Sequence, residues 1–199
     1  MARLALVVVD VQRDFCPGGS LAVRQGDAVV PRLNDVIEAF ERANLPIFLT
    51  RDWHPPNHCS FKSQGGIWPA HCVMGTAGAE FHNNLMVPPG STIISKASDP
   101  NFEAYSGFQG TDLAEQLRKR RVRELFVGGL ATDYCVKGTS IDAMENGFAV
   151  NIIRDCVRGV NLRRRDSALA LRVLAARGAR LVTSAQAIRS SLRAAMKSS

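Results

Sequence analysis

The chain has 199 residues, of which 46% are hydrophobic and 22% charged, and its formal net charge is +7. This composition is ordinary for a globular protein and predicts one domain over residues 1–199, with no linker dividing it. The hydrophobic run from Leu4 to Val9 is too short to cross a bilayer, and Asp10 and Arg13 interrupt any secretory signal core. Five cysteines without scaffold-like spacing agree with a reducing compartment, so we expect a cytoplasmic protein without a membrane partner.

The positive charge would permit nucleic-acid binding, but its distribution favours another interpretation. Basic residues concentrate between Arg118 and Arg123, at the end of a predicted helix, and between Arg163 and Arg165, at the beginning of another. Neither group is interleaved with aromatic residues, as a platform for single-stranded nucleic acid would be. We interpret both as solvated helix ends and predict no nucleic-acid partner.

Hydrophobic periodicity predicts strands and helices that alternate along the chain. Alternation of this kind favours an α/β fold, and nearly continuous hydrophobic strands are typical of a sheet covered on both faces. We therefore predict a six-stranded, mostly parallel sheet with helices on both faces, a Rossmann-like three-layer arrangement. The predicted strands are 2–9, 47–50, 92–95, 125–127, 149–153 and 181–183. The predicted helices are 29–43, 111–119, one that carries Cys135 in its first turn and stops near Gly147, 166–177, and one from about Ala185.

Cys135 lies directly after one of the predicted strands. Two glycines follow this strand, and Thr132 or Asp133 can cap a helix that carries Cys135 in its first turn. Free backbone N–H groups and the helix dipole at that position favour thiolate and could hold an oxyanion. Strand, tight turn and helix together predict a nucleophile elbow with sulfur in place of oxygen, although a cysteine can also be a small buried hydrophobic residue.

Polar residues follow three other predicted strands. Asp10 ends the first strand, Asp52 and His54 follow the second, and Lys96 follows the third. The carboxyl ends of parallel strands meet at one edge of a sheet, where ligands bind. We therefore expect these side chains to lie near Cys135.

The long segment from Asp52 to Gly90 lacks periodicity and is rich in Pro, Gly and His, which is typical of a functional loop. Asp52 and His54, with His58 and His71 nearby in sequence, could bind zinc, iron or manganese. One alternative is a structural zinc cluster formed by the pairs His58-Cys59 and His71-Cys72. Another is that the histidines only make hydrogen bonds.

The motifs together resemble the nicotinamidase/pyrazinamidase family of isochorismatase-like cysteine hydrolases, and the likeness runs from about residue 4 to residue 184. The Asp-Trp-His and Trp-Pro-x-His motifs are those that resemble nicotinamidases in particular. The motifs are Asp10-Val-Gln-Arg-Asp-Phe15, Asp52-Trp-His54, Trp68-Pro-Ala-His-Cys-Val73, Lys96, Tyr105-Ser-Gly-Phe108 and Gly129-Leu-Ala-Thr-Asp-Tyr-Cys-Val136.

The resemblance implies a role for each matching residue. It implies a six-stranded parallel sheet, a cis peptide bond between Leu130 and Ala131, and one divalent metal ion, which we expect to be zinc, with iron or manganese as alternatives. It leaves open whether His58 is a further ligand. The implied catalytic residues are Asp10, Lys96 and Cys135; the oxyanion-hole backbone is that of Ala131 and Cys135; the ring-binding residues are Phe15, Trp68 and Tyr105; and the metal ligands are Asp52, His54 and His71.

The implied reaction converts nicotinamide, and also pyrazinamide, to the acid and ammonia through a thioester, which places the enzyme in NAD salvage. Lys96 would keep Cys135 ionised, and Asp10 would carry the proton. Two other readings stay open: a related hydrolase acting on isochorismate or a carbamoyl amide, and a non-catalytic binding module on the same fold. The sequence also leaves a homo-oligomer open.

Overall fold

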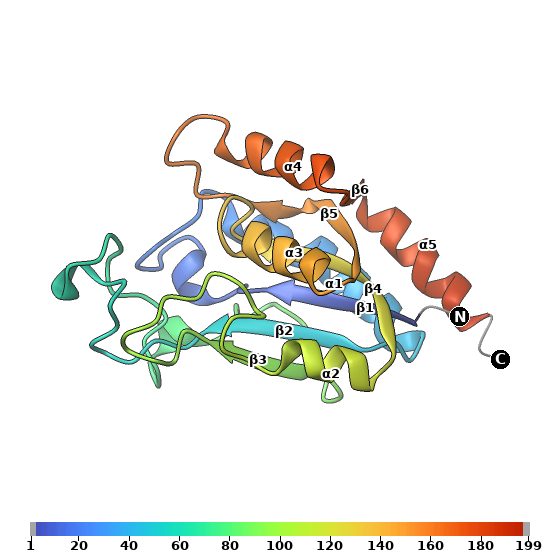
Figure 1. Ribbon diagram of the computed structural model, residues 1–199, viewed down its shortest axis with the longest axis horizontal. Helices are drawn as coiled ribbons and strands as arrows, with labels where there is room; N and C mark the ends of the chain where they lie inside the picture. The colour runs from blue at the N-terminus through green and yellow to red at the C-terminus, as the bar shows by residue number, and fades with distance from the viewer. Residues whose placement is uncertain (1–2, 197–199) are drawn as a thin grey trace.

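The computed structural model describes residues 3–196, which form a six-stranded sheet with helices on both faces (Figure 1). Every pair of neighbouring strands in this described part is parallel, so the predicted fold class is confirmed. The strand order is β3-β2-β1-β4-β5-β6. The strands are β1 (Arg3–Val9), β2 (Ile47–Asp52), β3 (Thr92–Lys96), β4 (Val122–Leu130), β5 (Ala149–Arg158) and β6 (Arg180–Val182).

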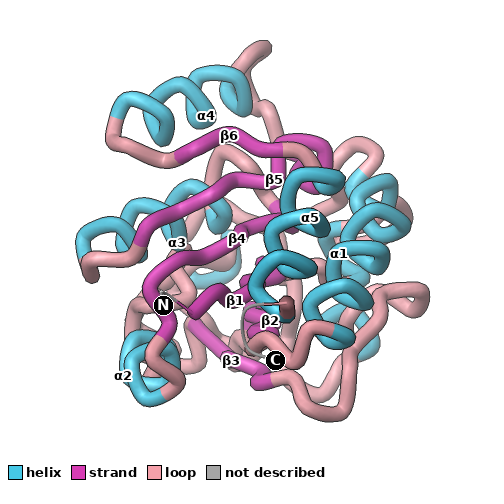
Figure 2. The backbone as a smooth tube through the Cα atoms, turned by 90° about the vertical axis from the view of Figure 1, so that its right-hand side faces the viewer, coloured by secondary structure: helices cyan, strands magenta, loops and turns pink. Residues whose placement is uncertain are grey.

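The helices divide between the two faces of the sheet (Figure 2). Helices α1 (Val30–Arg42) and α5 (Ser184–Ala195) pack together on one face. Helices α2 (Leu113–Lys119), α3 (Cys135–Glu145) and α4 (Asp166–Ala176) cover the other. Short 3₁₀ helices lie in the connections: η1 (Arg13–Phe15), η2 (Gly26–Val29), η3 (Lys62–Gln64) and η4 (Ala77–Ala79).

Strand β1 separates two hydrophobic cores. Successive side chains of a strand point to opposite faces of its sheet. Leu6 and Val8 therefore join the core under α1 and α5, whereas Val7 and Val9 join the core under α2 and α3. Burial on both faces explains why this strand is hydrophobic at nearly every position.

Most predicted elements are present, with ends that differ by a few residues. Strand β4 is longer than predicted because its polar and glycine residues pair with neighbouring strands despite their low hydrophobicity. For the same reason Asp52 and Lys96, predicted to follow their strands, are the last residues of β2 and β3, where they pair with each other. Ala2, predicted to start the first strand, lies outside the described residues.

The sheet contains a topological switch point between β1 and β4. The chain proceeds from β1 through β2 to β3 on one side and then returns to place β4 on the other side of β1. Open parallel sheets bind ligands beyond the carboxyl ends of the strands at such a point. Asp10 directly follows β1 and Cys135 follows β4, so both lie at this position.

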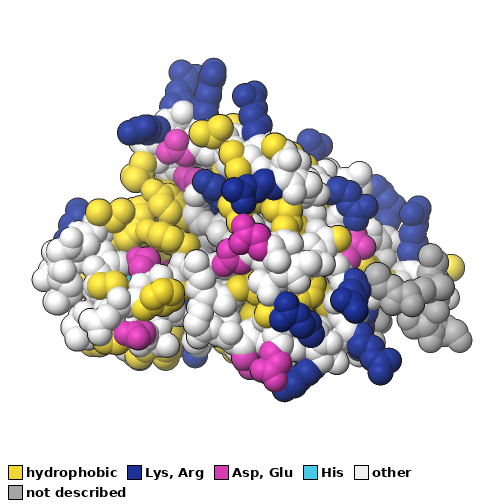
Figure 3. All heavy atoms as spheres, viewed as in Figure 1, with side chains coloured by type: hydrophobic (Ala, Val, Ile, Leu, Met, Phe, Trp, Pro, Cys, Tyr) yellow, Lys and Arg dark blue, Asp and Glu magenta, His cyan; other side chains and the backbone are white. Residues whose placement is uncertain are grey.

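The basic side chains are spread over the helices and not gathered in one groove on the face that Figure 3 shows. Arg118 donates a hydrogen bond to Asn146, and Arg120 donates to Gln116 and Thr92, so part of this charge stabilises local structure. Within residues 3–196, no helix combines the length and the apolar character needed to cross a membrane.

Candidate active site

Asp10, Lys96 and Cys135 come together at the carboxyl edge of the sheet. The ammonium of Lys96 lies 3.0 Å from Asp10 Oδ2 and 3.6 Å from Cys135 Sγ. All three residues are buried. Three chemically active groups that are distant in sequence therefore share one small volume.

The backbone and one threonine orient Asp10. Its φ of 49° is in the left-handed region, which turns the chain out of the sheet at the end of β1. Thr50 Oγ1 donates a hydrogen bond to Asp10 Oδ1 at 2.6 Å. Asp10 Oδ2 accepts no well-directed hydrogen bond from another described residue, and it faces Lys96. This oxygen is free to accept a proton from a neighbouring group.

Lys96 is held between two carboxylates. Besides its ion pair with Asp10, it donates to the Asp52 carboxylate and, at 3.1 Å, to the carbonyl oxygen of Ala104. A buried ammonium is stable only when opposite charges and hydrogen-bond acceptors surround it. Burial opposes ionisation of Lys96, but Asp10 and Asp52 outweigh it and hold the pKa of Lys96 well above its ordinary value. Lys96 is therefore a fixed positive charge.

Cys135 lies in the first turn of α3, as predicted, and is its first residue, but the predicted cap is wrong. The N-cap residue is Tyr134, and its side chain makes no capping hydrogen bond to the described part of the helix. The Asp133 carboxylate instead accepts the N–H groups of Val160 and Asn161. The Cys135 N–H, at the first helical position, has no intrahelical acceptor. The cis peptide bond predicted between Leu130 and Ala131 is present.

The resting charge of Cys135 also differs from the prediction. The sequence favoured a thiolate, but burial raises the pKa of the Cys135 thiol well above its ordinary value. Lys96 lowers this pKa, whereas Asp10 and Asp52 raise it, and the sum favours the neutral thiol. Burial likewise raises the pKa of Asp10. The raised pKa of Asp10 makes this carboxylate a better proton acceptor than an ordinary aspartate. The pair is therefore arranged for proton transfer from the Cys135 sulfur to the Asp10 carboxylate.

Asp52, His54 and His71 form a second cluster, buried next to the first. One potential ligand atom from each lies within 4.8 Å of the others. His54 Nε2 is 3.6 Å from Asp52 Oδ2, and the buried His54 Nδ1 has no hydrogen-bond partner among the described residues. His71 Nδ1 lies 2.8 Å from the Pro69 carbonyl oxygen, so this nitrogen donates and Nε2 can act as a ligand.

The donor set of this cluster fits a divalent metal ion. Burial lowers the pKa of His71, which keeps the imidazole neutral as ligation requires. Burial opposes ionisation of Asp52, but Lys96 and then His54 outweigh it, so the pKa of Asp52 lies below its ordinary value. Two imidazoles, one of which has a buried ring nitrogen without a hydrogen-bond partner among the described residues, and one carboxylate match a site for zinc or a similar cation.

Aromatic side chains surround these clusters. The indole N–H of Trp68 donates to the Tyr105 hydroxyl at 3.0 Å. Both rings pack against Tyr134, with centroids 5.1 and 5.5 Å from it. Phe15 lies beside His71, with ring centroids 5.6 Å apart. The predicted ring-binding residues thus fall into two groups, Phe15 next to the metal ligands and Trp68 with Tyr105 next to the α3 start.

Residues 4–186 match the isochorismatase domain model. The chain belongs to the isochorismatase family. It is 41% identical to the nicotinamidase of Escherichia coli, an alignment that covers 92% of this chain and 96% of that protein. The structure is also similar to the crystal structure of Pyrococcus horikoshii pyrazinamidase in complex with zinc, with a TM-score of 0.88 and 48% sequence identity. This alignment covers 91% of this chain and 99% of that one. A structure from L. infantum in complex with nicotinate is 34% identical with a TM-score of 0.84, covering 92% of this chain and 94% of that one.

In this isochorismatase-family chain, the alternative zinc cluster is contradicted. Among the described residues, neither Cys59 nor Cys72 belongs to a group of potential metal ligands. His58 is occupied elsewhere, because its Nδ1 lies 2.8 Å from Ser60 Oγ and its Nε2 lies 3.1 Å from the Phe102 carbonyl oxygen. His58 therefore links its own loop to the loop at Phe102 and is not one of the three clustered residues.

Sequence reasoning missed three residues that shape this family member's site. Tyr134 packs against both Trp68 and Tyr105, and its position next to Cys135 in the sequence was the available signal. Thr50 is hydrogen-bonded to Asp10, but nothing in the sequence distinguishes it from an ordinary strand threonine. Gln12 is fully buried against Asp52, and its place two residues after Asp10 was the available signal.

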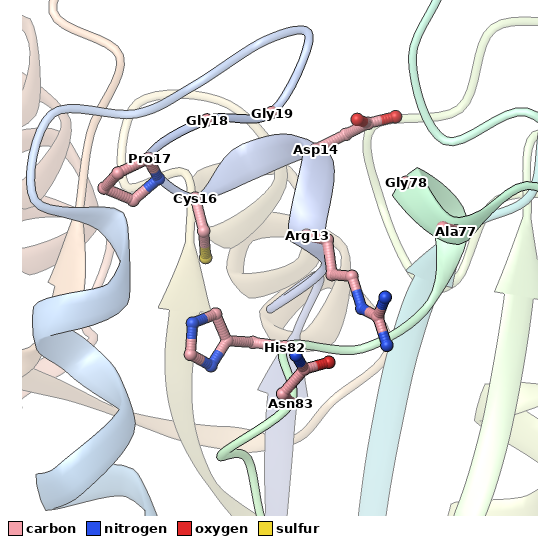
Figure 4. Close-up of a pocket in the computed structure, with 10 residues that line it drawn as sticks. All are labelled: Arg13, Asp14, Cys16, Pro17, Gly18, Gly19, Ala77, Gly78, His82 and Asn83. Carbon is pink, nitrogen blue, oxygen red and sulfur yellow. The ribbon is translucent and has the colours of Figure 1, made fainter.

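A pocket of about 380 Å³ lies between the turn at residues 13–19 and the segment 77–83 (Figure 4). Arg13, Cys16 and His82 are among its lining residues, and the Cys16 thiol points into it toward the His82 ring. Burial raises the pKa of Cys16 to about 11, so this thiol is a poor nucleophile. The lining contains no residue of the two buried clusters, so the pocket is separate from the candidate active site.

Proposed function

We propose that this protein hydrolyses nicotinamide to nicotinate and ammonia through a thioester on Cys135, and that it also accepts pyrazinamide. The observation that carries the proposal is that the Lys96 ammonium contacts three groups at once. These are the proposed base Asp10, the sulfur of the proposed nucleophile Cys135, and the candidate metal ligand Asp52. The similarity to nicotinamidases and pyrazinamidases supports the same substrate class.

The first step is attack of sulfur on the amide carbonyl carbon. Cys135 transfers its proton to Asp10 Oδ2 as the sulfur–carbon bond forms, because the thiol is neutral at rest and that oxygen is free. The carbonyl oxygen becomes an oxyanion. We assign the N–H groups of Ala131 and Cys135 as its donors, each worth roughly 3 kcal/mol in comparable sites.

The second step expels ammonia. Asp10 returns the proton to the amide nitrogen, the carbon–nitrogen bond breaks, and the thioester remains. Asp10 then takes a proton from water, whose oxygen attacks the thioester carbonyl, and the carbon–sulfur bond breaks with return of the proton to Cys135. Lys96 stays charged throughout, stabilising the ionised form of Asp10 and lowering the cost of negative charge on sulfur.

The heteroaromatic ring needs a flat hydrophobic pocket and a partner for its nitrogen. Phe15, Trp68 and Tyr105 would supply the pocket walls. Asp52, His54 and His71 would hold the divalent ion, which we propose to be zinc, and the ion when bound would supply a Lewis acid that orients the ring nitrogen. The scissile carbonyl has its own backbone donors, so ring orientation and carbonyl activation are separate tasks.

The product suggests the cellular role. Nicotinate released here would supply NAD salvage. All five cysteines are unpaired, which suits the reducing cytoplasm where we propose the enzyme acts.

The test is ammonia and nicotinate production from nicotinamide by purified protein, with product identity verified by mass spectrometry. Pyrazinamide should be hydrolysed as well. Isochorismate and a carbamoyl amide such as N-carbamoylsarcosine serve as competing substrates. Hydrolysis of either one with no turnover of nicotinamide would refute the proposal and favour the related hydrolase, whereas no hydrolysis of any substrate would favour a binding module.

A further inference from the structure

The side chains of Gln12 and Asp14 attach to the backbone beside two candidate metal ligands. Gln12 Nε2 donates to the Asp52 carbonyl oxygen at 2.7 Å, and Gln12 Oε1 accepts from the Asp52 N–H at 2.8 Å. Asp14 Oδ2 accepts from the Cys72 N–H at 2.7 Å, in the peptide bond that follows His71. Gln12 and Asp14 therefore reach the metal cluster without being among its three ligands.

Gln12 replaces a missing strand partner. The parallel ladder between β1 and β2 ends with Val9 opposite Thr50, and the chain leaves the sheet at Asp10. The N–H and C=O of Asp52 that face β1 would then have no partner, which is costly in a buried position. The Gln12 carboxamide supplies one acceptor and one donor in place of the absent peptide group, and its Nε2 also donates to Ala79 at 2.8 Å.

Asp14 holds a strained part of the second ligand segment. Cys72 has a φ of 46°, in the left-handed region that non-glycine residues rarely adopt. The Asp14 carboxylate fixes the peptide group before Cys72 and also accepts from the Ser20 N–H at 3.2 Å. Gly78 lies so close that a Cβ there would overlap this carboxylate, and Figure 4 shows Asp14 beside the Ala77–Gly78 turn.

We propose that Gln12 and Asp14 are positioning residues for the metal centre, which fix the backbone at Asp52 and His71 and thereby set metal affinity. The inference rests on the metal site of the proposed function. Ligand atoms must be held within about 0.5 Å of the required geometry. Mutation of residues that orient the ligands typically weakens metal binding by about 10- to 100-fold. Three hydrogen bonds from residues 12 and 14 therefore control the backbone at two of the three ligands.

The experiment measures binding of cobalt(II), alone, to metal-free protein by absorption spectroscopy with competition from a chelator. The variants are Gln12→Glu, which keeps the size but loses the amide donor, and Asp14→Asn, which removes one acceptor. Each should raise the cobalt dissociation constant by about 10- to 100-fold and shift the ligand-field bands, because the ligand geometry relaxes. Thermal denaturation of the metal-free proteins records any general loss of stability separately.

Asn34 provides a matched control. Its side chain makes the same pair of bonds to backbone, donating to the Asn84 carbonyl oxygen at 2.7 Å and accepting from the Met86 N–H at 2.8 Å, and neither partner is one of the candidate metal ligands. Asn34→Asp should therefore leave the cobalt dissociation constant and spectrum as in the wild type. Weakening by Asn34→Asp equal to that by Gln12→Glu would overturn the inference, as would wild-type affinity in both test variants. Should Gln12→Glu fail to fold, Asp14→Asn decides alone.

Nicotinamide hydrolysis by the wild type is measured in parallel. Weakened cobalt binding in the variants, with no hydrolysis by the wild type, would support the inference and refute the proposed substrate. A wild-type protein that binds no cobalt would overturn both the metal site and the inference.

Discussion

The ammonium of Lys96 lies 3.6 Å from the sulfur of Cys135, and both groups are buried. The proximity lowers the pKa of the thiol, but burial and two carboxylates raise it by more. The sulfur is therefore neutral until a base takes its proton. This relationship makes Asp10 the group on which reaction rate should depend most directly after Cys135 itself.

Replacing the nucleophile should abolish turnover. Cys135→Ala is expected to lower kcat for nicotinamide by about 10⁴-fold or more, because the thioester can no longer form. Ammonia release measures the loss, and circular dichroism verifies the fold. Cys59→Ala is the matched control, since this half-buried thiol lies outside the cluster, and it should keep wild-type kcat. Appreciable turnover by Cys135→Ala would exclude the thioester mechanism.

The acid side of the pH profile should report Asp10. The carboxyl must be ionised to accept the thiol proton, and its ionised fraction falls as pH drops through its pKa. Burial raises this pKa above the ordinary value of 3.8, so kcat/KM should decline at a higher pH than an ordinary aspartate would give. Asp10→Asn should lower kcat by about 10²- to 10⁴-fold and remove this limb of the profile. An unchanged acid limb in Asp10→Asn would assign the titration to another group.

Removing the charge of Lys96 should affect both stability and the pH profile. In Lys96→Met, Asp10 and Asp52 lose the cation that favours their ionised forms, so the acid limb of kcat/KM should move to higher pH. Removing one partner of a buried ion pair typically lowers the free energy of unfolding by roughly 3–5 kcal/mol. Chemical denaturation measures this cost.

Lys119→Met is the control for that experiment. Lys119 also pairs with a carboxylate, that of Glu115, but at the exposed surface of α2. Its removal should leave the denaturation midpoint and the pH profile unchanged. Equal destabilisation by both variants would show that the buried position of Lys96 has no special effect.

The metal site should discriminate between two amides. His54→Ala, or removal of the ion by a chelator, should weaken binding of nicotinamide much more than binding of benzamide, which lacks the ring nitrogen. The reason is that the proposed ion orients the ring and leaves carbonyl activation to backbone donors. Inhibition or binding constants for both amides provide the comparison, and His82→Ala, outside the cluster, is the control. Equal weakening of both amides would contradict the ring-nitrogen model.

The fold class and the neighbourhood of the site could be predicted from the order of residues alone. Runs such as Leu4 to Val9 predict a strand from local composition alone, and parallel strands bring their carboxyl ends to one edge. From this, Asp10, Lys96 and Cys135 could be expected to lie together. The ends of β2 and β3 could not be placed, because Asp52 and Lys96, whose numbers differ by 44, extend their strands by pairing with each other.

The charge of Cys135 and the roles of His58 and Gln12 depend on contacts that exist only in the folded chain. A helix start favours a thiolate, but the depth of burial and two carboxylates reverse that preference, and neither is a local property of the sequence. His58 has the spacing of a ligand, yet its ring is bonded to Ser60 and to the Phe102 carbonyl oxygen. Gln12 binds Asp52 because β1 leaves the sheet two residues earlier. Spacing limits which side chains can meet, whereas burial and hydrogen-bond competition in the folded chain determine what they do when they meet.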